Sequence, residues 1–226
     1  MRSHRDAVIA ASTAMPGRLG PFHARLRTYS GWALTLTLAF AAVYGGLNWW
    51  TAERAFRFRL HGTWELAIPH VPEAALAYVS IQLLFLLPLW VLSVPRIARL
   101  GRAMLAAIVS AGVVFALLPT ELGFARAVPD GWLAPLYRTI FALDLPHNLF
   151  PSLHVALCTL VMLFLVRDAH RRARALYLLW WLALAVSVLL THQHHLLDVA
   201  GGLALGLASY AGSRDGRFPP GALRGA

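Results

Sequence analysis

The sequence predicts an all-α integral membrane bundle of six transmembrane helices. Apolar residues make up 58% of the 226 residues and charged residues only 13%, which lies well outside the balance of a soluble domain. Six stretches contain no Asp, Glu, Lys or Arg, and about 20 largely apolar residues suffice to cross a bilayer as a helix. These stretches are 28–52, 74–95, 103–120, 145–166, 175–197 and 199–213.

The six stretches differ in how clearly the sequence marks their ends. The first ends at Trp49 and Trp50, and such residues are typical of a membrane interface. The fourth contains Pro151, which suits the start of a helix. The third, fourth and sixth are short or interrupted, so their boundaries are defined only to within several residues. We predict one domain at 28–213, preceded by a cytoplasmic segment at 1–27 and followed by a cytoplasmic tail at 214–226.

The arginines orient this bundle, because cytoplasmic loops of membrane proteins carry an excess of basic residues. With six crossings, 15 of the 20 basic residues fall on one side of the membrane. The five on the other side are Arg54, Arg57, Arg59, Arg126 and Arg138. We therefore expect a protein of the bacterial cytoplasmic membrane with both termini in the cytoplasm. The net charge of +10 is then mostly arginine beside anionic lipid, and no nucleic-acid partner is expected.

Two segments on the predicted outer side connect the apolar stretches. Residues 53–72 mix Arg, His, Trp and Pro with apolar residues. This composition fits either an amphipathic segment on the membrane surface or a solvated loop. Residues 121–148 carry Arg126, Arg138, Asp144 and His147. Both segments would lie over the outer face of the bundle.

Two histidine motifs lie at the ends of apolar stretches. The first is Phe-Pro-Ser-Leu-His at 150–154, and the second is Gln-His-His-Leu-Leu-Asp at 193–198. Two apolar segments, 155–166 and 175–190, separate them, and two crossings return a chain to the side that it left. The motifs can therefore meet on the outer face of the bilayer. Ionisable residues at the edge of hydrophobic spans are costly to bury and indicate a functional site.

The spacing within the second motif indicates nucleophilic chemistry. Asp198 follows His194 by four residues, and if the chain is helical from Leu196 onward the two side chains project from one face, one turn apart. A carboxylate there can fix the imidazole tautomer and stabilise its charged form, which makes His194 the candidate nucleophile. His154 is the candidate general acid and base. The alternatives are that Asp198 only caps the sixth helix and that the histidines are packing residues.

Pro151-Ser152-Leu153-His154 and His194-x-x-x-Asp198, followed by Val199-Ala200-Gly201, resemble the second and third signature motifs of the type 2 phosphatidic acid phosphatase superfamily. Asn148-x-Phe150-Pro-Ser-Leu-His-Val-Ala and Gln193-His194 are more similar to its inositol-phosphorylceramide-synthase-like branch. Weaker similarities to that branch are Ile68-Pro69-x-x-Pro72, Tyr78-x-Ser80 and Pro119-Thr120.

The resemblance implies a phosphohistidine mechanism without metal or other cofactor. By analogy His194 attacks phosphorus, Asp198 orients His194, and His154 protonates the leaving oxygen. The first motif of the superfamily, Lys-x6-Arg-Pro, is absent, since the chain has no lysine. The third motif usually carries Ser-Arg before the nucleophile, and Ser187-Val188 stands at those positions.

The residues that bind the substrate phosphate must therefore differ from the family pattern. We expect them among Ser152, Arg126, Arg138 and His192. Ser152 can cap a helix or donate to a phosphate oxygen at a helix N-terminus. Arg126 and Arg138 lie in an outer loop and present paired donors, although both also suit anchors for lipid headgroups. His192 lies two residues before His194.

We expect a membrane enzyme that hydrolyses a phosphomonoester or diphosphate of a lipid at the outer membrane face. The alternative is a phosphotransferase that moves a phospho-headgroup to an alcohol acceptor, since the two reactions differ only in the acceptor. The expected partners are the lipid phosphate and membrane lipids, and the sequence specifies no oligomeric state. Candidate substrates are phosphatidate, phosphatidylglycerol phosphate, a polyprenyl phosphate or diphosphate, and a phosphosphingolipid.

Two other function classes fit the sequence less well. A metal-dependent membrane enzyme is suggested by His192, His194 and His195, but such enzymes need several histidine-rich boxes to fill a coordination sphere. A transporter would place its polar residues along a path across the bilayer midplane. In this chain they gather at one face.

Overall fold

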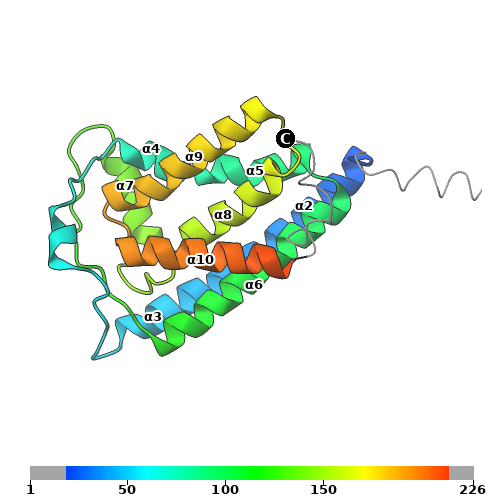
Figure 1. The fold of residues 1–226 in the computed structure, drawn as a ribbon. Coiled ribbons are helices and arrows are strands. Elements are labelled where there is room, and N and C mark those ends of the chain that lie inside the picture. Colours follow the sequence, from blue (N-terminus) through cyan, green and yellow to red (C-terminus); the bar gives the residue numbers. More distant parts are fainter. Residues whose placement is uncertain (1–18, 214–226) are drawn as a thin grey trace, which may run out of the picture.

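The computed structural model describes residues 19–213, and this part of the chain is all-helical, without strands (Figure 1). The predicted all-α fold class is confirmed there. Residues 1–18 of the predicted N-terminal segment and the predicted tail, 214–226, lie outside the described residues. The first helix begins at Phe22, ahead of the predicted domain boundary at Thr28.

The long helices follow the six apolar stretches in order. The first runs through α2 (Phe22–Phe40), a π-helical turn (Ala41–Gly45) and α3 (Gly46–Ala52), and the second through α4 (Ala74–Val79) and α5 (Ile81–Val91). The others are α6 (Val94–Leu117), α8 (Leu153–Val166), α9 (Arg171–Leu190) and α10 (Leu196–Gly212). A 3₁₀ helix (Thr63–Ala67) and the short helix α7 (Ala134–Leu143) lie between them.

Within the described residues, four helical segments are long and apolar enough to cross a membrane. They are Phe22–Ala52, Ala74–Val91, Val94–Leu117 and Arg171–Leu190. The helices α8 and α10 are apolar but have only 14 and 17 residues. A 14-residue helix is about 21 Å long, less than the ~30 Å of a hydrocarbon core. The apolar helices indicate a membrane protein, and the count of six crossings stays a prediction.

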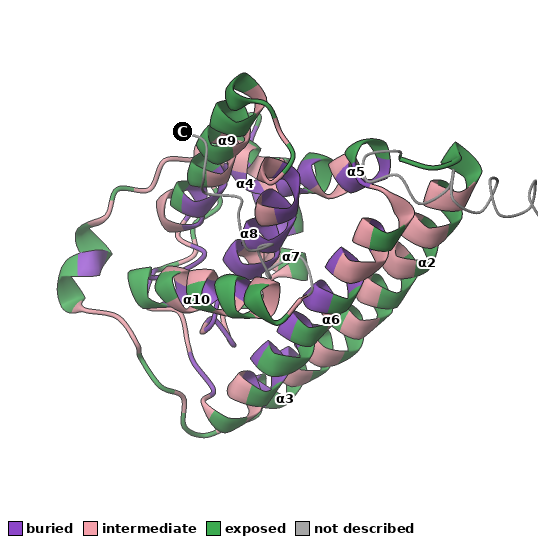
Figure 2. Cartoon of the chain, turned by 45° about the vertical axis from the view of Figure 1, so that its right-hand side comes forward, coloured by how far each residue is buried: buried purple, intermediate pink, exposed green. Residues whose placement is uncertain are grey.

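The helix α8 forms the centre of the bundle. Its sequence is apolar on all sides, which is typical of a helix surrounded by other helices. It packs against α5, α6, α9 and α10, and most of its residues are buried (Figure 2). His154, in its first turn, is only half-buried. The core therefore fixes α8 while leaving His154, at its start, partly exposed.

Glycines allow α10 to approach α8 closely. A Cβ at Gly202 would overlap the carbonyl oxygen of Ser152, and a Cβ at Gly206 would lie 2.9 Å from the carbonyl oxygen of Ala156. Both contacts are closer than real side-chain atoms adopt, so only glycine fits at these two positions. These contacts bring the N-terminal ends of α8 and α10, which carry the two histidine motifs, next to each other (Figure 1).

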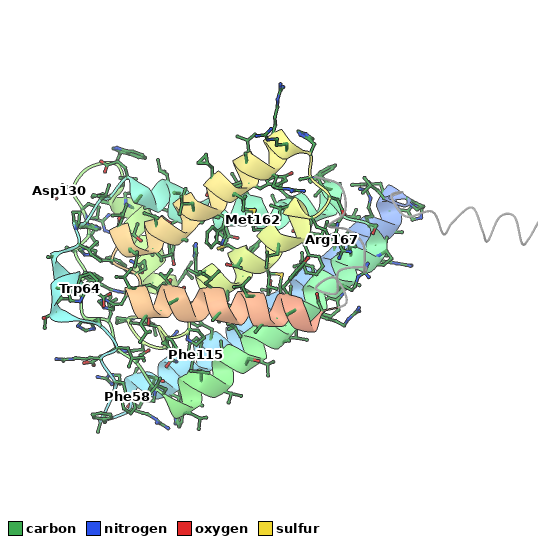
Figure 3. The ribbon with its side chains drawn as sticks, viewed as in Figure 1. Phe58, Trp64, Phe115, Asp130, Met162 and Arg167 are labelled. Carbon is green, nitrogen blue, oxygen red and sulfur yellow. The ribbon has the colours of Figure 1, made fainter. Side chains whose placement is uncertain are left out.

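The two ends of the bundle carry different segments. Trp64 and Asp130 lie at one end and Arg167 lies toward the other (Figure 3). At the first end, residues 53–72 and 118–148 cover the starts of α8 and α10 (Figure 1), and we call them the outer segments. Backbone bonds of Phe58 to Pro119 (2.7 Å) and Glu121 (3.1 Å) join the two segments. Only a 3₁₀ turn of residues 53–72 is helical, so they form an ordered layer rather than an amphipathic α-helix.

We predict that Gly202→Ala destabilises the protein by about 1–3 kcal/mol, because the added methyl group meets the backbone of α8. Gly212→Ala is the matched control, since a Cβ there contacts nothing within 4 Å. Alanine at Gly212 should leave stability unchanged or raise it slightly. Thermal unfolding in detergent compares the two, and equal stability of both variants would contradict the close contact.

Candidate active site

A tight turn between α9 and α10 carries the second histidine motif. The backbone N–H groups of Gln193 and His194 both donate to the carbonyl oxygen of Val188, at 2.9 and 3.1 Å. His192 has a φ of 55°, in the left-handed region that non-glycine residues rarely adopt. Such strained conformations are found where surrounding structure enforces them, often at functional sites. The turn therefore holds His194 in a defined position.

Asp198 caps α10 and lies beside His194, whose Nδ1 has no hydrogen-bond partner among the described residues. Its Oδ2 accepts a hydrogen bond from the backbone N–H of His195 at 2.8 Å, which caps α10. The same oxygen lies 3.6 Å from Nδ1 of His194, and both side chains are buried. That distance exceeds a normal hydrogen bond, and such contacts are often long in enzymes without substrate. Because Nδ1 lies on the side of the carboxylate, Nε2 is the candidate reactive nitrogen.

The backbone at the start of α8, which carries His154, is hydrogen-bonded to the second motif. The N–H of Ser152 donates to the carbonyl oxygen of Asp198 at 3.0 Å. His154 and His194 lie within electrostatic reach of each other. The ring of His154 stacks on Tyr78, with ring centroids 4.4 Å apart, and its Nε2 has no hydrogen-bond partner among the described residues. The structure thus brings His154, His194 and Asp198 together.

The predicted phosphate-binding residues occupy different places. Ser152 is fully buried, and its Oγ accepts from the N–H of Val155 at 3.3 Å, so it caps α8. His192 contacts the outer segments instead of the other motif, because its Nε2 lies 2.9 Å from the carbonyl oxygen of Ile68. Arg138 is exposed on α7, and within residues 19–213 no hydrogen bond or ion pair joins it to either motif.

Arg126 is the predicted arginine that reaches the second motif. Its Nη2 lies 3.5 Å from Oε1 of Gln193, the residue before His194. The guanidinium group also lies over the ring of Phe141, 4.9 Å from its centroid. Burial lowers the pKa of Arg126, while the nearby Asp144 carboxylate acts in the opposite direction. Arg126 therefore places a partly desolvated cation beside the histidine pair.

A stack of rings, which the sequence pattern did not reveal, fastens the outer segments to the turn. His61 stacks on His195 (4.2 Å), His195 on Phe124 (4.5 Å), and Phe124 on His192 (3.9 Å). We call these four residues the ring stack. The N–H of Gly123 also donates to Nε2 of His195 at 3.0 Å. The scattered histidines of residues 53–72 were the only signal of this contact.

Glu65 and Asp144 are two further acidic residues that tertiary contacts bring to the site. Glu65 accepts from the N–H of Leu196 at 2.8 Å, where its charge also suits the N-terminus of α10. Asp144 accepts from the hydroxyl groups of Tyr44 and Tyr78, one at each carboxylate oxygen. Because Tyr78 stacks on His154, Asp144 fixes the residue that supports the first histidine.

The three histidines of the turn do not point at a common centre. His192 contacts Ile68, His194 faces Asp198, and His195 lies in the ring stack. In the described part of the chain, no group of three or more His, Cys, Asp or Glu side chains is arranged to hold a metal ion.

Comparison with known proteins gave one match. A family model described as the PAP2 superfamily matches residues 51–212, which include both histidine motifs and the outer segments. No curated protein and no solved structure matches the chain.

We predict that acid weakens the contact between the outer segments and the turn that carries His195. Burial, followed by the charge of His61, lowers the pKa of His195 to about 4, whereas an unfolded histidine titrates near 6.5. The folded state thus disfavours the protonated ring. Its stabilising contribution is complete above pH ~6.5 and is lost as the pH falls from there toward 4.

Melting temperatures in detergent between pH 7.5 and 4.5 measure this effect. The melting temperature of the wild-type protein should decrease with falling pH. His195→Gln should make that decrease smaller by several degrees, because it removes the titrating ring. His23→Gln, at an exposed position in the first turn of α2, is the control and should keep the wild-type profile. Identical profiles for wild type and His195→Gln would contradict the prediction.

Proposed function

The chain belongs to the PAP2 superfamily, the type 2 phosphatidic acid phosphatases, and from this premise we propose that it is a membrane lipid-phosphate phosphatase with a phosphohistidine intermediate. Membership supports a phosphatase- or phosphotransferase-type activity. The single observation that carries the proposal is the meeting of His154, His194 and Asp198 at the joined ends of α8 and α10.

In the first step Nε2 of His194 attacks phosphorus, and the bond between phosphorus and the lipid oxygen breaks. Protonated His154 gives its proton to the departing oxygen, which leaves as an alcohol. Asp198 holds the Nδ1 proton of His194 and stabilises the positive charge that develops on the ring. In the second step His154 takes a proton from water, whose oxygen attacks phosphorus and releases phosphate. Both histidines then return to their starting states.

A pocket beside α8 supports a lipid substrate. It has a volume of about 420 Å³ and is lined by apolar residues of α2, α5, α6 and α8. Leu157 and Val161 line it, one and two turns along α8 from His154. A hydrocarbon chain can therefore lie between the helices while the phosphate stays at the histidines.

The proposed topology has six crossings, with α8 and α10 completing the bundle although they are shorter than a full span. The helices α8, α9 and α10 run alternately between the two ends (Figure 1), which supports this count. With six crossings most arginines of the sequence fall on the side of Arg167, which lies toward one end of the bundle (Figure 3), and this bias supports a cytoplasmic location of that end and of both termini. The histidines then face outward from a bacterial cytoplasmic membrane.

The outer segments favour transfer to an alcohol as the second candidate reaction. Only 7% of the surface of His194 is exposed beneath the ordered layer. Restricted access of water lengthens the life of a phosphohistidine. An alcohol bound in the site can then replace water as the acceptor of the phosphoryl group. This alternative agrees with the resemblance to inositol-phosphorylceramide synthases, and it needs no change in the residues of the first step.

We expect His194→Ala, His154→Ala and Asp198→Asn each to lower turnover at least about 100-fold, because each removes a nucleophile, a general acid or its orienting group. The assay uses purified protein and a panel of lipid phosphates, with and without polyol acceptors, and measures free phosphate and transferred headgroup. His170→Ala, in the loop before α9, is the control and should keep wild-type activity.

The same assay tests the remaining parts of the proposal. Turnover should survive EDTA and should be blocked by vanadate, since a phosphohistidine route uses imidazole where a metal enzyme uses bound hydroxide. Near-normal turnover by His194→Ala would reject the mechanism. Loss of activity on chelation, restored by zinc or iron, would instead favour a metal-dependent enzyme.

A further inference from the structure

Three side chains of α3 and the outer segments carry buried polar atoms without a hydrogen-bond partner among the described residues. They are Asn48 and Asn148, each 1% exposed, and Arg126, whose Nε is buried. Folded proteins pair nearly all buried polar groups, and an exception requires an explanation. The unpaired atoms at these positions include the side-chain donors Nδ2 of both asparagines and Nε of the arginine.

Contacts of Asn148 engage its side-chain oxygen and its backbone but not its side-chain donor. Its Oδ1 accepts from the hydroxyl of Thr51 at 2.8 Å, and its N–H donates to the carbonyl oxygen of Thr120 at 3.1 Å. With Oδ1 engaged, Nδ2 is the free end of the amide. Asn148 also has a φ of 55°, a strained conformation that the surrounding contacts enforce.

Asn48 faces the same segment as Asn148. It lies between Tyr44 and Thr51, about one turn from each, on the helix that ends in α3. Tyr44 donates to Asp144 and Thr51 donates to Asn148, so this face of the helix lies against residues 144–148. Asn48 lies between these two contacts, and neither Nδ2 nor Oδ1 of its amide has a partner with hydrogen-bond geometry among the described residues, although the amide also acts on the neighbouring Tyr44 hydroxyl.

Two chains of contacts connect these donors with the histidines. Asp144 accepts from Tyr78, and the ring of Tyr78 stacks on His154. Arg126 interacts with the charge of Asp144 and with Gln193, the neighbour of His194. These contacts connect Arg126 and Asp144 with both histidine motifs. The two asparagines border the same cluster through the helix that carries Tyr44 and Thr51, since Tyr44 also donates to Asp144 and Thr51 donates to Asn148.

We propose that the amides of Asn48 and Asn148, together with Arg126, bind the phosphoryl oxygens of the substrate. This inference rests on the proposed function and deepens it, since it names the groups that replace the absent Lys-x6-Arg-Pro motif. A phosphoryl group offers several acceptor oxygens and no obligatory donor, which complements one cation and two neutral donors. The same donors stabilise the charge that develops on these oxygens during transfer.

The test measures binding of inorganic phosphate and of vanadate to the full-length protein in detergent, from the rise in melting temperature with ligand concentration. This readout needs no turnover. Asn48→Ala and Asn148→Ala should each raise the dissociation constant about 10-fold or more, because each removes a hydrogen bond to a charged group. Asn48→Ser and Asn148→Ser are made in parallel, and should act in the same direction if an alanine variant does not fold.

Thr159→Val is the control for loss of a buried hydrogen bond away from the cluster. Thr159 is 3% exposed and accepts from the indole of Trp181 at 2.9 Å. The Thr159→Val substitution should lower the melting temperature without changing the affinity for phosphate. Unchanged affinity in the asparagine variants, or no stabilisation of the wild-type protein by either anion, would overturn the inference.

Turnover of the lipid-phosphate panel separates this inference from the proposed function. If the wild-type protein releases phosphate from lipids but the asparagine variants bind phosphate normally, the phosphate-binding assignment fails and the proposed function stands. If phosphate binding depends on both asparagines but no lipid phosphate is turned over, the assignment stands and the proposed function fails.

Discussion

The close contact between the starts of α8 and α10 determines the rest of the site. The N–H of Ser152 donates to the carbonyl oxygen of Asp198, and Gly202 lets the backbones approach to that distance. Since His154 and Asp198 belong to these two helix starts, the same contact sets the position of each relative to His194. A side chain at Gly202 would separate the helices and the histidines together. The packing of α8 against α10 therefore also fixes the geometry of the candidate active site.

Burial beneath the outer segments gives this arrangement its electrostatic character. The ring stack and Glu65 hold those segments against the turn, and His194 is left with little exposed surface. Interactions between charges are stronger where water is excluded, so in the proposed mechanism Asp198 acts on His194, and Arg126 on the phosphate, with greater effect. The cost is a set of buried polar atoms on Asn48 and Asn148 that pair only when a ligand provides acceptors.

Local patterns in the sequence predicted part of this structure. His154, His194 and Asp198 could be identified as candidates because they stand in two short motifs at the starts of α8 and α10, although His194 lies in the turn before α10 rather than on the helix. The apolar stretches predicted the helices, but not that α8 has only 14 residues and depends on its neighbours for burial. The contact of Glu65 with Leu196 joins residues 131 positions apart, and that of Tyr44 with Asp144 joins residues 100 apart. Such tertiary contacts leave no periodic signal, which is why these residues and Asn48 were not predicted.

Detection of a phosphorylated His194 tests the central claim most directly. The protein is mixed with a lipid phosphate labelled at phosphorus, quenched in alkali within the first turnover, digested and sequenced by mass spectrometry. The account predicts an acid-labile, alkali-stable phosphoryl group on His194, at a higher steady-state level in the absence of an alcohol acceptor. Turnover with no label on the protein, or with the label on another residue, would contradict it.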